Sequence, residues 1–317
     1  MNRLPFMEPI HVLGGGSIGL LFASSIRMAF PSYPIAVLLR PHHEVRLSKE
    51  SSRYYMEVCV SRLNRPRVVR LPAVLIGGTN SHSLPASKKI RNVLLATKAP
   101  DASAAISTIK TNLQPDSRIL LLCNGALAVR EEIQAMLPHN PITLISTTHG
   151  AYREDSDDEL YHVTHAGIGR THVQDDEPLA RLLDQSGLHA ESTNEIETML
   201  WLKLAANCII NPITAILGCR NGDLPLRPEF QAMAPSVVEE ICQVCPDKTL
   251  TPTRLQQFVD QVIEDTVHNK SSMLQDVENR HTTEIAYLNG YIVRRGLTLG
   301  IPTPVNQAIC DTINGLL

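Results

Sequence analysis

Apolar and polar positions divide this chain into two halves with different patterns. In the first half, short apolar runs alternate with stretches of helical periodicity, which is typical of an α/β fold. Beyond about residue 192, the apolar positions repeat with helical spacing, and no clear strand pattern follows. We therefore predict an α/β domain in residues 1–192 and an all-helical domain in residues 193–317.

A glycine-rich segment follows the first apolar run. Residues 10–13 read as a strand and residues 20–29 as a helix, and between them Gly14, Gly16 and Gly19 fit Gly-x-Gly-x-x-Gly. The first glycine permits a tight turn, the second lets a pyrophosphate approach the backbone, and the third lets helix and strand pack closely. A plain glycine turn is the alternative, but the strand and helix on either side favour a Rossmann-type dinucleotide site. The predicted cofactor-binding residues here are Gly14, Gly15, Gly16, Ser17, Ile18 and Gly19.

The second apolar run, residues 35–39, ends at Arg40. Sites for NAD usually place an acidic residue about 20 residues beyond the glycines, on the ribose hydroxyls. A guanidinium in this place suits a 2′-phosphate through a charge-assisted fork. A solvated loop arginine is the alternative. Because the discriminating carboxylate is absent, we predict NADP (NADPH) rather than NAD as the cofactor.

Polar residues follow three further apolar runs of this half. Residues 92–96, 118–123 and 142–148 read as buried strands, and Lys98, Asn124 and Thr148 lie at or just beyond their ends. Ligands of open α/β sheets bind beyond the carboxyl ends of the strands. Each residue alone fits a simple strand cap, but together they predict one crevice shared with the glycine segment.

A polar stripe interrupts the most apolar helical pattern of the second half. Residues 199–210 contain only two polar residues, Lys203 and Asn207, and Asn211 follows. Successive steps of four residues drift by only about 40° around a helix, so these three side chains share one face. We expect the other faces to be buried. Ser192 and Glu195 have the spacing of a capping box, which places the start of this helix at residue 192.

The lysine of this stripe has two interpretations. It either snorkels to solvent from the edge of the helix, or it lies in a cleft that binds a polar ligand. Met199 and Asn207, its neighbours one turn away, supply no carboxylate partner. The two aligned asparagines favour the cleft, in which Lys203 would act as a proton donor.

Composition excludes several classes of partner. The net charge of −3 gives no electrostatic footprint for nucleic acid or for an anionic membrane, and we find no apolar run long enough to span a bilayer. Seven cysteines, an odd number, together with an N-terminus that lacks a signal pattern, favour reduced thiols and a cytoplasmic protein. The pair Cys242 and Cys245 has no further ligands nearby, so we predict no metal site.

Two sequence blocks carry a resemblance to a known family. Residues 201–212 read Trp-Leu-Lys-Leu-Ala-Ala-Asn-Cys-Ile-Ile-Asn-Pro, residues 269–276 read Asn-Lys-Ser-Ser-Met-Leu-Gln-Asp, and Glu284 follows. With the glycine segment, these blocks resemble the ketopantoate reductase (2-dehydropantoate 2-reductase) family over nearly the whole chain. The resemblance implies a Rossmann-type NADPH domain, an all-helical domain, and reduction of ketopantoate to pantoate in pantothenate and coenzyme A biosynthesis.

The resemblance also implies roles for single residues. The match of Lys203 is the family's proton donor and contacts the substrate. We expect Glu284 to orient either Lys203 or the nicotinamide ribose, and to supply the counter-charge of Lys203. The matches that hold the substrate are Asn207, Asn211, Asn221 and Ser272. The matches on the cofactor side of the cleft, or on both sides, are Arg40, Lys98, Asn124, Ala151 and Glu284.

Some positions depart from the family pattern. Cys123 stands where glutamine is common, Ala286 stands where an aspartate usually follows, and little of a final helix is evident beyond Asn306. These departures leave open an NADP-dependent reductase of another 2-oxo or 3-hydroxy acid. A non-catalytic NADPH-binding regulator is a third reading, against which the retained Lys203 and Glu284 argue. The resemblance is compatible with a monomer or a homodimer.

Overall fold

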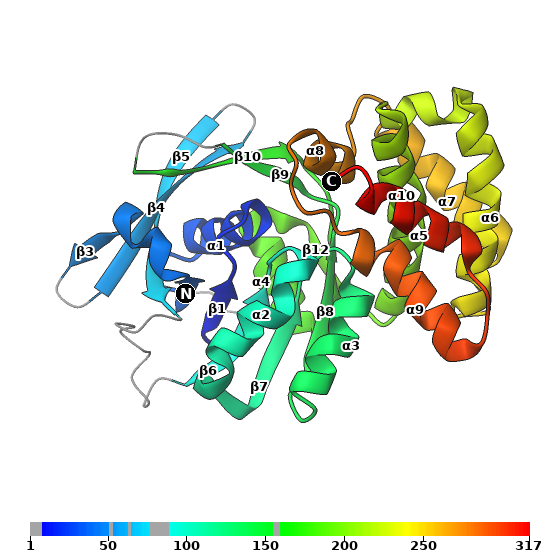
Figure 1. The fold of residues 1–317 in the computed structure, drawn as a ribbon. Coiled ribbons are helices and arrows are strands. Elements are labelled where there is room, and N and C mark those ends of the chain that lie inside the picture. The colour runs from blue at the N-terminus through cyan, green and yellow to red at the C-terminus, as the bar shows by residue number, and fades with distance from the viewer. Residues whose placement is uncertain (1–7, 51–52, 63–64, 77–88, 155–158) are drawn as a thin grey trace. The chain divides into compact units, whose positions relative to one another are not determined.

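The computed structural model describes residues 8–50, 53–62, 65–76, 89–154 and 159–317. The chain forms two compact units, Met1–Ile196 and Glu197–Leu317. The first unit contains the strands, and the second is helical, as Figure 1 shows. The predicted class, an α/β N-terminal part followed by an all-helical part, is therefore confirmed.

One mixed sheet organises the first unit. The described strands follow the order β12-β11-β8-β7-β6-β1-β2-β5-β4-β10-β9, and β3 pairs with β4. Their bounds are β1 (Ile10–Leu13), β2 (Ile35–Leu39), β3 (Ser48–Glu50), β4 (Arg53–Arg62), β5 (Arg65–Leu75), β6 (Ile90–Leu95), β7 (Leu113–Leu121), β8 (Ile142–Thr147), β9 (Gly150–Glu154), β10 (Tyr161–Gly167), β11 (Thr171–Gln174) and β12 (Ala190–Thr193). Strands β4 and β5 pair antiparallel.

The centre of this sheet is parallel, and its connections define a switch point. Strands β8, β7, β6, β1 and β2 all run in one direction. Helix α1 (Ser17–Ala29) leads from β1 to β2, whereas α2 (Ala99–Ile109) leads from β6 to β7 in the opposite direction across the sheet. Since such crossovers are right-handed, the two helices cover opposite faces. The chain therefore reverses between β1 and β6, which is where open α/β sheets bind ligands.

The apolar runs of the sequence become the core of this unit. The strands β1, β2 and β6 are buried at nearly every position, as expected for parallel strands covered on both faces. Helix α1 buries Leu20, Leu21, Phe22 and Ile26 against them. Two further helices complete the unit, α3 (Ala126–Met136) and α4 (Glu177–Leu183).

The second unit is built around its longest helix, α5 (Ile196–Leu217). The others are α6 (Pro228–Val244), α7 (Pro252–Asp265), α8 (Ser272–Glu278), α9 (Asn289–Leu299) and α10 (Pro304–Asn314). Buried polar side chains fix their contacts. The Asn289 amide donates to the Cys208 carbonyl of α5, and the Glu240 carboxylate accepts from the backbone N–H groups of Val305 and Asn306, which caps α10.

Two local predictions were wrong. Ser192 does not open the long helix, because it pairs with Val173 inside β12, and α5 begins only at Ile196. Strand β12 forms here instead of a capping box because the backbone of β11 pairs with it as far as Thr193. The chain also has a full final helix, α10, whose buried residues include Ile309 and Ile313.

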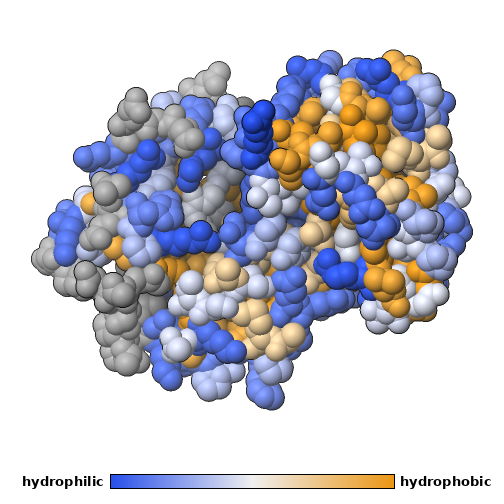
Figure 2. All heavy atoms as spheres, viewed as in Figure 1, coloured by the Kyte–Doolittle hydropathy of each residue, from blue (hydrophilic) through white to orange (hydrophobic). Residues whose placement is uncertain are grey.

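Contrary to the prediction from the sequence, helix α5 is long and apolar enough to cross a membrane by length and composition alone. However, 67% of its most apolar window is buried within the structure, so it is the core helix of its unit. Exposed apolar side chains gather on the visible face of this unit in Figure 2. Among the described residues of this unit, the most exposed large apolar side chains are those of Leu226 and Leu297.

Candidate cofactor and catalytic sites

The glycine segment forms the turn between β1 and α1, beside the switch point. Gly14 has a φ of +120°, which only glycine adopts readily, and a Cβ there would lie 2.9 Å from the Ala96 carbonyl oxygen. A Cβ on Gly19 would lie 2.6 Å from the Gly14 carbonyl oxygen. Both glycines are therefore required by close backbone contacts, as the sequence predicted.

Gly16 has a different surrounding. It is exposed at the N-cap of α1, and the nearest atom to a Cβ there would be the Ala96 carbonyl oxygen at 3.9 Å. Within the described ranges no side chain caps the helix, and its first turn carries no acid. The space beside Gly16 is thus open at the start of α1, which is the positive end of the helix dipole. Ser17 and Ile18 begin this turn. The loop fits a dinucleotide pyrophosphate.

Arg40 follows β2 at the same edge of the sheet. Its Nη2 atom lies 3.3 Å from Oδ1 of Asp101, in the first turn of α2, and both side chains are 54% exposed. An exposed pair of this kind is worth little, about 0–1 kcal/mol. A phosphate can therefore compete with Asp101 for the guanidinium at small cost.

A second arginine contacts the loop, and sequence reasoning missed it. Arg153 on β9 donates from Nη1 to the Gly15 carbonyl oxygen at 3.3 Å. It stands two residues beyond Ala151, which the sequence had assigned to the cofactor side. Nothing in the local pattern distinguishes Arg153, because the contact joins positions 138 residues apart.

The pKa of His43 reflects the cations that lie around it. Burial, followed by the neighbouring charges of His42, Arg153, Arg46 and Arg40 in that order, lowers the pKa of His43 from 6.5 to about 4. Its Nδ1 atom lies 3.0 Å from the Tyr161 hydroxyl. Three guanidinium groups therefore act on one imidazole near the end of β2, and the local potential favours an anion.

The three residues at strand ends have different surroundings. Lys98 is the N-cap of α2 after β6, and Asn124 follows β7 just before Gly125, the N-cap of α3. Both stand beside the switch point, at the same edge as the glycine loop. Thr148 follows β8 farther along the sheet, and its Oγ1 atom accepts from the Arg170 backbone N–H at 2.9 Å.

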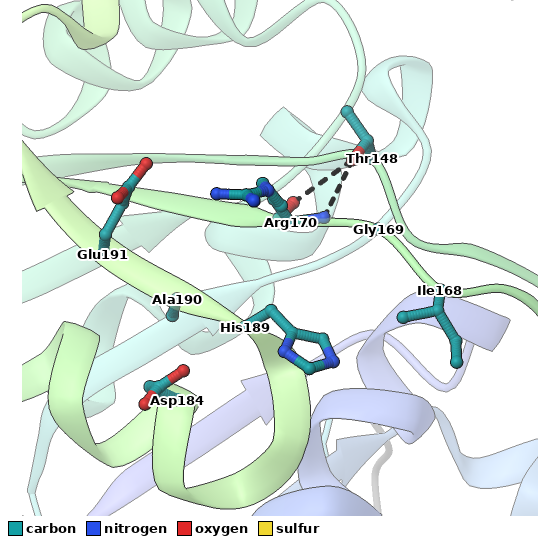
Figure 3. Close-up of a pocket in the computed structure, with 8 residues that line it drawn as sticks. All are labelled: Thr148, Ile168, Gly169, Arg170, Asp184, His189, Ala190 and Glu191. Carbon is teal, nitrogen blue, oxygen red and sulfur yellow. Dashed lines mark hydrogen bonds between the residues drawn. The ribbon is translucent and has the colours of Figure 1, made fainter. Parts of the chain in front are cut away.

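Thr148 lines a separate open pocket of about 490 Å³ (Figure 3). The pocket lies where β8, β11 and β12 meet, and its other lining residues are Ile168, Gly169, Arg170, Asp184, His189, Ala190 and Glu191. In Figure 3 the Arg170 guanidinium and the Glu191 carboxylate lie on the same side of the pocket. Glu191 also pairs with His172 at 3.0 Å. Groups of both signs line this pocket, so its charge does not select one ligand class.

A buried histidine pair lies behind this pocket. The His149 Nδ1 atom accepts from the Gly169 N–H at 2.9 Å, and Nε2 lies 3.0 Å from the Leu188 carbonyl oxygen. Nδ1 is therefore the unprotonated nitrogen, and Nε2–H donates. His165 Nε2 lies 3.0 Å from the same Nδ1 atom and donates to it. Through these contacts His149 joins His165 of β10 to the segments that contain Gly169 and Leu188. The pair therefore has a structural role.

The histidine pair predicts a pH-dependent stability. Burial, with smaller effects of His149, Arg62 and His189, lowers the pKa of His165 from 6.5 to about 4. Between these values the unfolded chain binds more protons, so the free energy of unfolding falls as pH falls, and below pH 4 this contribution stops changing. The slope for one group cannot exceed about 1.4 kcal/mol per pH unit.

Urea unfolding at pH 7 and pH 5 measures this effect. Wild type should lose more stability between the two values than His165→Gln, which keeps a donor for His149 and does not titrate. Equal losses in both proteins would show that His165 does not titrate on unfolding.

The polar stripe of the helical unit is present as predicted. Lys203, Asn207 and Asn211 are half-buried on α5. The residues between them, 204–206 and 208–210, are all buried. From residue 203 to residue 211, the stripe is thus the partly open line of the helix.

Hydroxyl groups link the start of helix α8 to helix α5 near this stripe. Thr214 on α5 is fully buried, and its Oγ1 atom lies 2.6 Å from the Ser271 hydroxyl. The Ser271 oxygen caps α8 by accepting from the Leu274 N–H at 3.1 Å, and it lies 3.4 Å from the Asn211 carbonyl oxygen. Ser271 is therefore the structural cap, whereas the predicted substrate residue Ser272 is exposed at the start of α8.

Asn221 and Glu284 are both buried, at 6% and 8% exposure. The Asn221 amide donates to Thr266 Oγ1 at 2.9 Å, whereas its Oδ1 atom has no hydrogen-bond partner among the residues that the structure describes. A buried acceptor of this kind marks a place for a ligand or water donor. Glu284 precedes a 3₁₀ turn (Ile285–Tyr287), in which Ala286 is exposed.

A glycine turn at the switch point of a parallel sheet, joined in sequence to a helical unit with a polar stripe, defines a class of dinucleotide-binding oxidoreductases. Comparison with known families agrees. Residues 10–178 match the family model described as ketopantoate reductase PanE/ApbA, and residues 195–316 match its C-terminal counterpart. The chain belongs to the ketopantoate reductase PanE/ApbA family.

Named relatives are similar over most of the chain. The 2-dehydropantoate 2-reductase of Vibrio cholerae is 37% identical over 233 residues, which covers 71% of this chain and 77% of the relative. That of Escherichia coli O157:H7 is 34% identical over 234 residues, or 70% and 72% of the two chains. The protein is an oxidoreductase of this family, and its first unit is a Rossmann-type domain for a nicotinamide dinucleotide.

Solved structures share the fold at lower identity. A PanE/ApbA family ketopantoate reductase from Ralstonia eutropha JMP134 superposes with a TM-score of 0.80 at 23% identity, covering 98% of both chains. A D-mandelate dehydrogenase solved with NADH and anilino(oxo)acetate superposes with a TM-score of 0.81 at 21% identity, also over 98% of both.

Proposed function

We propose that this protein reduces 2-dehydropantoate to pantoate with NADPH. The observation that carries the proposal is the half-buried stripe of Lys203, Asn207 and Asn211 on the core helix α5, in a chain whose relatives at 34–37% identity are named 2-dehydropantoate 2-reductase. This reaction serves pantothenate and coenzyme A synthesis, and we propose the cytoplasm as its place. The proposed boundary between the two domains lies between residues 192 and 193.

In this proposal the glycine loop, Arg40, Lys98, Asn124 and Ala151 hold the cofactor, which supplies a hydride when bound. Hydride addition to a keto carbon leaves negative charge on its oxygen. The Lys203 ammonium stabilises that charge and delivers a proton to the oxygen.

The remaining polar groups bind and orient the substrate. Asn207, Asn211 and Ser272 donate to its carboxylate and hydroxyl oxygens, and Asn221 Oδ1 accepts from its hydroxyl group. Glu284 supplies the counter-charge that a partly enclosed ammonium requires, because an unpaired charge is costly to bury. The hydroxyl link from Thr214 through Ser271 holds the start of α8, and with it Ser272, against the turn of α5 that contains Asn211.

A reductase of another 2-oxo acid is the second candidate. Two observations favour it: Cys123 replaces the glutamine common in the family, and the chain superposes on a D-mandelate dehydrogenase as closely as on a family reductase. Asp101, which pairs with Arg40, places an acidic group near the end of β2. Because sites for NAD have an acidic residue on the ribose hydroxyls, this group makes NADH the alternative cofactor to NADPH.

One assay distinguishes these candidates. We expect NADPH oxidation, followed by absorbance, to give its highest kcat/KM with 2-dehydropantoate among a panel of aliphatic and aryl 2-oxo acids. NADH in place of NADPH should give a lower value. A higher kcat/KM for an aryl 2-oxo acid would favour the second candidate, and turnover with no panel member would favour a non-catalytic dinucleotide-binding protein.

A further inference from the structure

Helix α5 contains a proline in the turn that carries the polar stripe. Pro212 lies inside the helix, directly after Asn211. A proline has no N–H group to donate to the carbonyl four residues earlier, and its ring crowds that carbonyl. In α5 this is the carbonyl of Cys208, which follows Asn207. The usual helical hydrogen bond is therefore missing between two residues of the stripe, Asn207 and Asn211.

A side chain of another helix donates to this carbonyl instead. Asn289, the first residue of α9, is completely buried, and its amide nitrogen lies 2.9 Å from the Cys208 carbonyl oxygen. Cys208 is also completely buried, so bulk water does not take this place. A buried carbonyl without a donor is costly. The Asn289 amide thus replaces the N–H group that Pro212 lacks.

A buried network fixes the direction in which the Asn289 amide points. Its nitrogen also lies 2.9 Å from Oδ1 of Asn306, which is completely buried on α10. The Asn306 amide nitrogen donates in turn to the Glu240 carboxylate of α6 at 2.7 Å. Since a carboxylate only accepts, Asn306 must present its oxygen to Asn289. Helices α6, α9 and α10 together hold one donor against the turn of α5.

From this arrangement we propose that Asn289 is a positioning residue for the reaction. It acts through the Cys208 carbonyl and holds the turn from Asn207 to Asn211 in the shape in which both amides bind the substrate. The inference rests on the proposed function, in which the stripe binds a 2-oxo acid. A firm support matters because a displacement of about 1 Å can cost about 100-fold in rate.

Steady-state kinetics of Asn289→Leu test this role. Leucine has nearly the shape of asparagine and no donor. We expect KM for the 2-oxo acid to rise by about 10- to 100-fold, and more than kcat falls, because the two amides of the stripe lose their alignment. The Kd for NADPH, measured by calorimetric titration, should stay near wild type, because the proposed cofactor residues are mainly in the first unit. A purely structural asparagine would change neither constant in folded protein.

Pro212→Ala tests whether the effect passes through the Cys208 carbonyl. Alanine restores the N–H group that proline lacks, so the helix itself can donate to this carbonyl. In the Pro212→Ala background, Asn289→Leu should therefore leave KM near the value for Pro212→Ala alone. Such non-additivity is expected when two residues serve the same group. An equal rise of KM in both backgrounds would overturn the proposed route.

Asn140→Leu is the matched control for the loss of a buried asparagine. The Asn140 amide donates to the Ser117 carbonyl at 2.8 Å within the first unit. This variant should lose stability in urea, as Asn289→Leu does, and keep KM near wild type. If Asn289→Leu does not fold, Asn289→Ser takes its place, because serine leaves no apolar group beside the Asn306 amide.

Hydrogen exchange separates this inference from the proposed function. Without any ligand, the backbone amides of residues 207–211 should exchange faster in Asn289→Leu than in wild type, and Pro212→Ala should remove the difference. If 2-dehydropantoate is not reduced, the kinetics use the 2-oxo acid with the highest kcat/KM. If none is reduced, the proposed function fails, and exchange alone decides whether Asn289 holds this turn. Unchanged KM and unchanged exchange in folded Asn289→Leu would overturn the inference.

Discussion

Replacing Lys203 with methionine is expected to lower kcat by about 10²–10⁴, the usual effect of losing a positioned general acid. Methionine keeps the length and the apolar stem of the side chain, so α5 should pack as before. Binding of NADPH should change little, because the proposed cofactor residues are mainly in the first unit. A single-turnover rate and a melting temperature, both measured on the same variant, test this expectation.

The two interpretations of this lysine predict opposite results. A structural lysine would cost stability when removed and leave the turnover of each folded molecule intact. Lys248→Met is the matched control, because Lys248 belongs to the same unit and donates to the Cys245 carbonyl at 2.8 Å, outside the stripe. It should retain wild-type kcat. A stable Lys203→Met variant with a near wild-type rate would end the assignment, and Lys98 would become the next candidate.

Gly19→Ala is expected to weaken dinucleotide binding by about 100-fold and also to destabilise the fold. The added Cβ would lie 2.6 Å from the Gly14 carbonyl oxygen and 3.2 Å from the Ala96 Cβ. Since the first of these atoms is backbone, the loop itself must move. Overpacking of this kind costs about 1–3 kcal/mol, against a gain of about 1 kcal/mol for alanine over glycine inside a helix. The clash should exceed the gain.

Gly16→Ala is the matched control for stability. Its Cβ would approach no atom closer than 3.9 Å, so the free energy of unfolding should stay close to that of wild type. The same methyl group would occupy the open space at the N-cap of α1, where the pyrophosphate is expected, and should therefore weaken NADPH binding. Urea unfolding and calorimetric titration measure the two effects. Wild-type affinity in both glycine variants would place the cofactor elsewhere.

The sequence alone was sufficient where one local pattern has one physical solution. Glycines at 14, 16 and 19 between a strand and a helix predict the turn, and the structure shows the close contacts that require two of them. The stripe on α5 follows in the same way, because spacing by four residues places Lys203, Asn207 and Asn211 on one helix face whatever surrounds it. Local pattern failed at Ser192, where pairing with β11 prevailed over a capping sequence.

The contacts between distant segments were decided by the tertiary structure. Arg153 reaches Gly15 only because the sheet brings β9 beside α1, and the hydroxyl pair of Thr214 and Ser271 joins positions 57 residues apart. His149 lies just before β9, and His165 lies near the end of β10. The two side chains meet because β9 and β10 pair antiparallel, which brings the start of one strand beside the end of the other. Periodicity records which side of an element is buried. It does not record which other element covers that side, and that choice depends on strand order and register across the whole sheet.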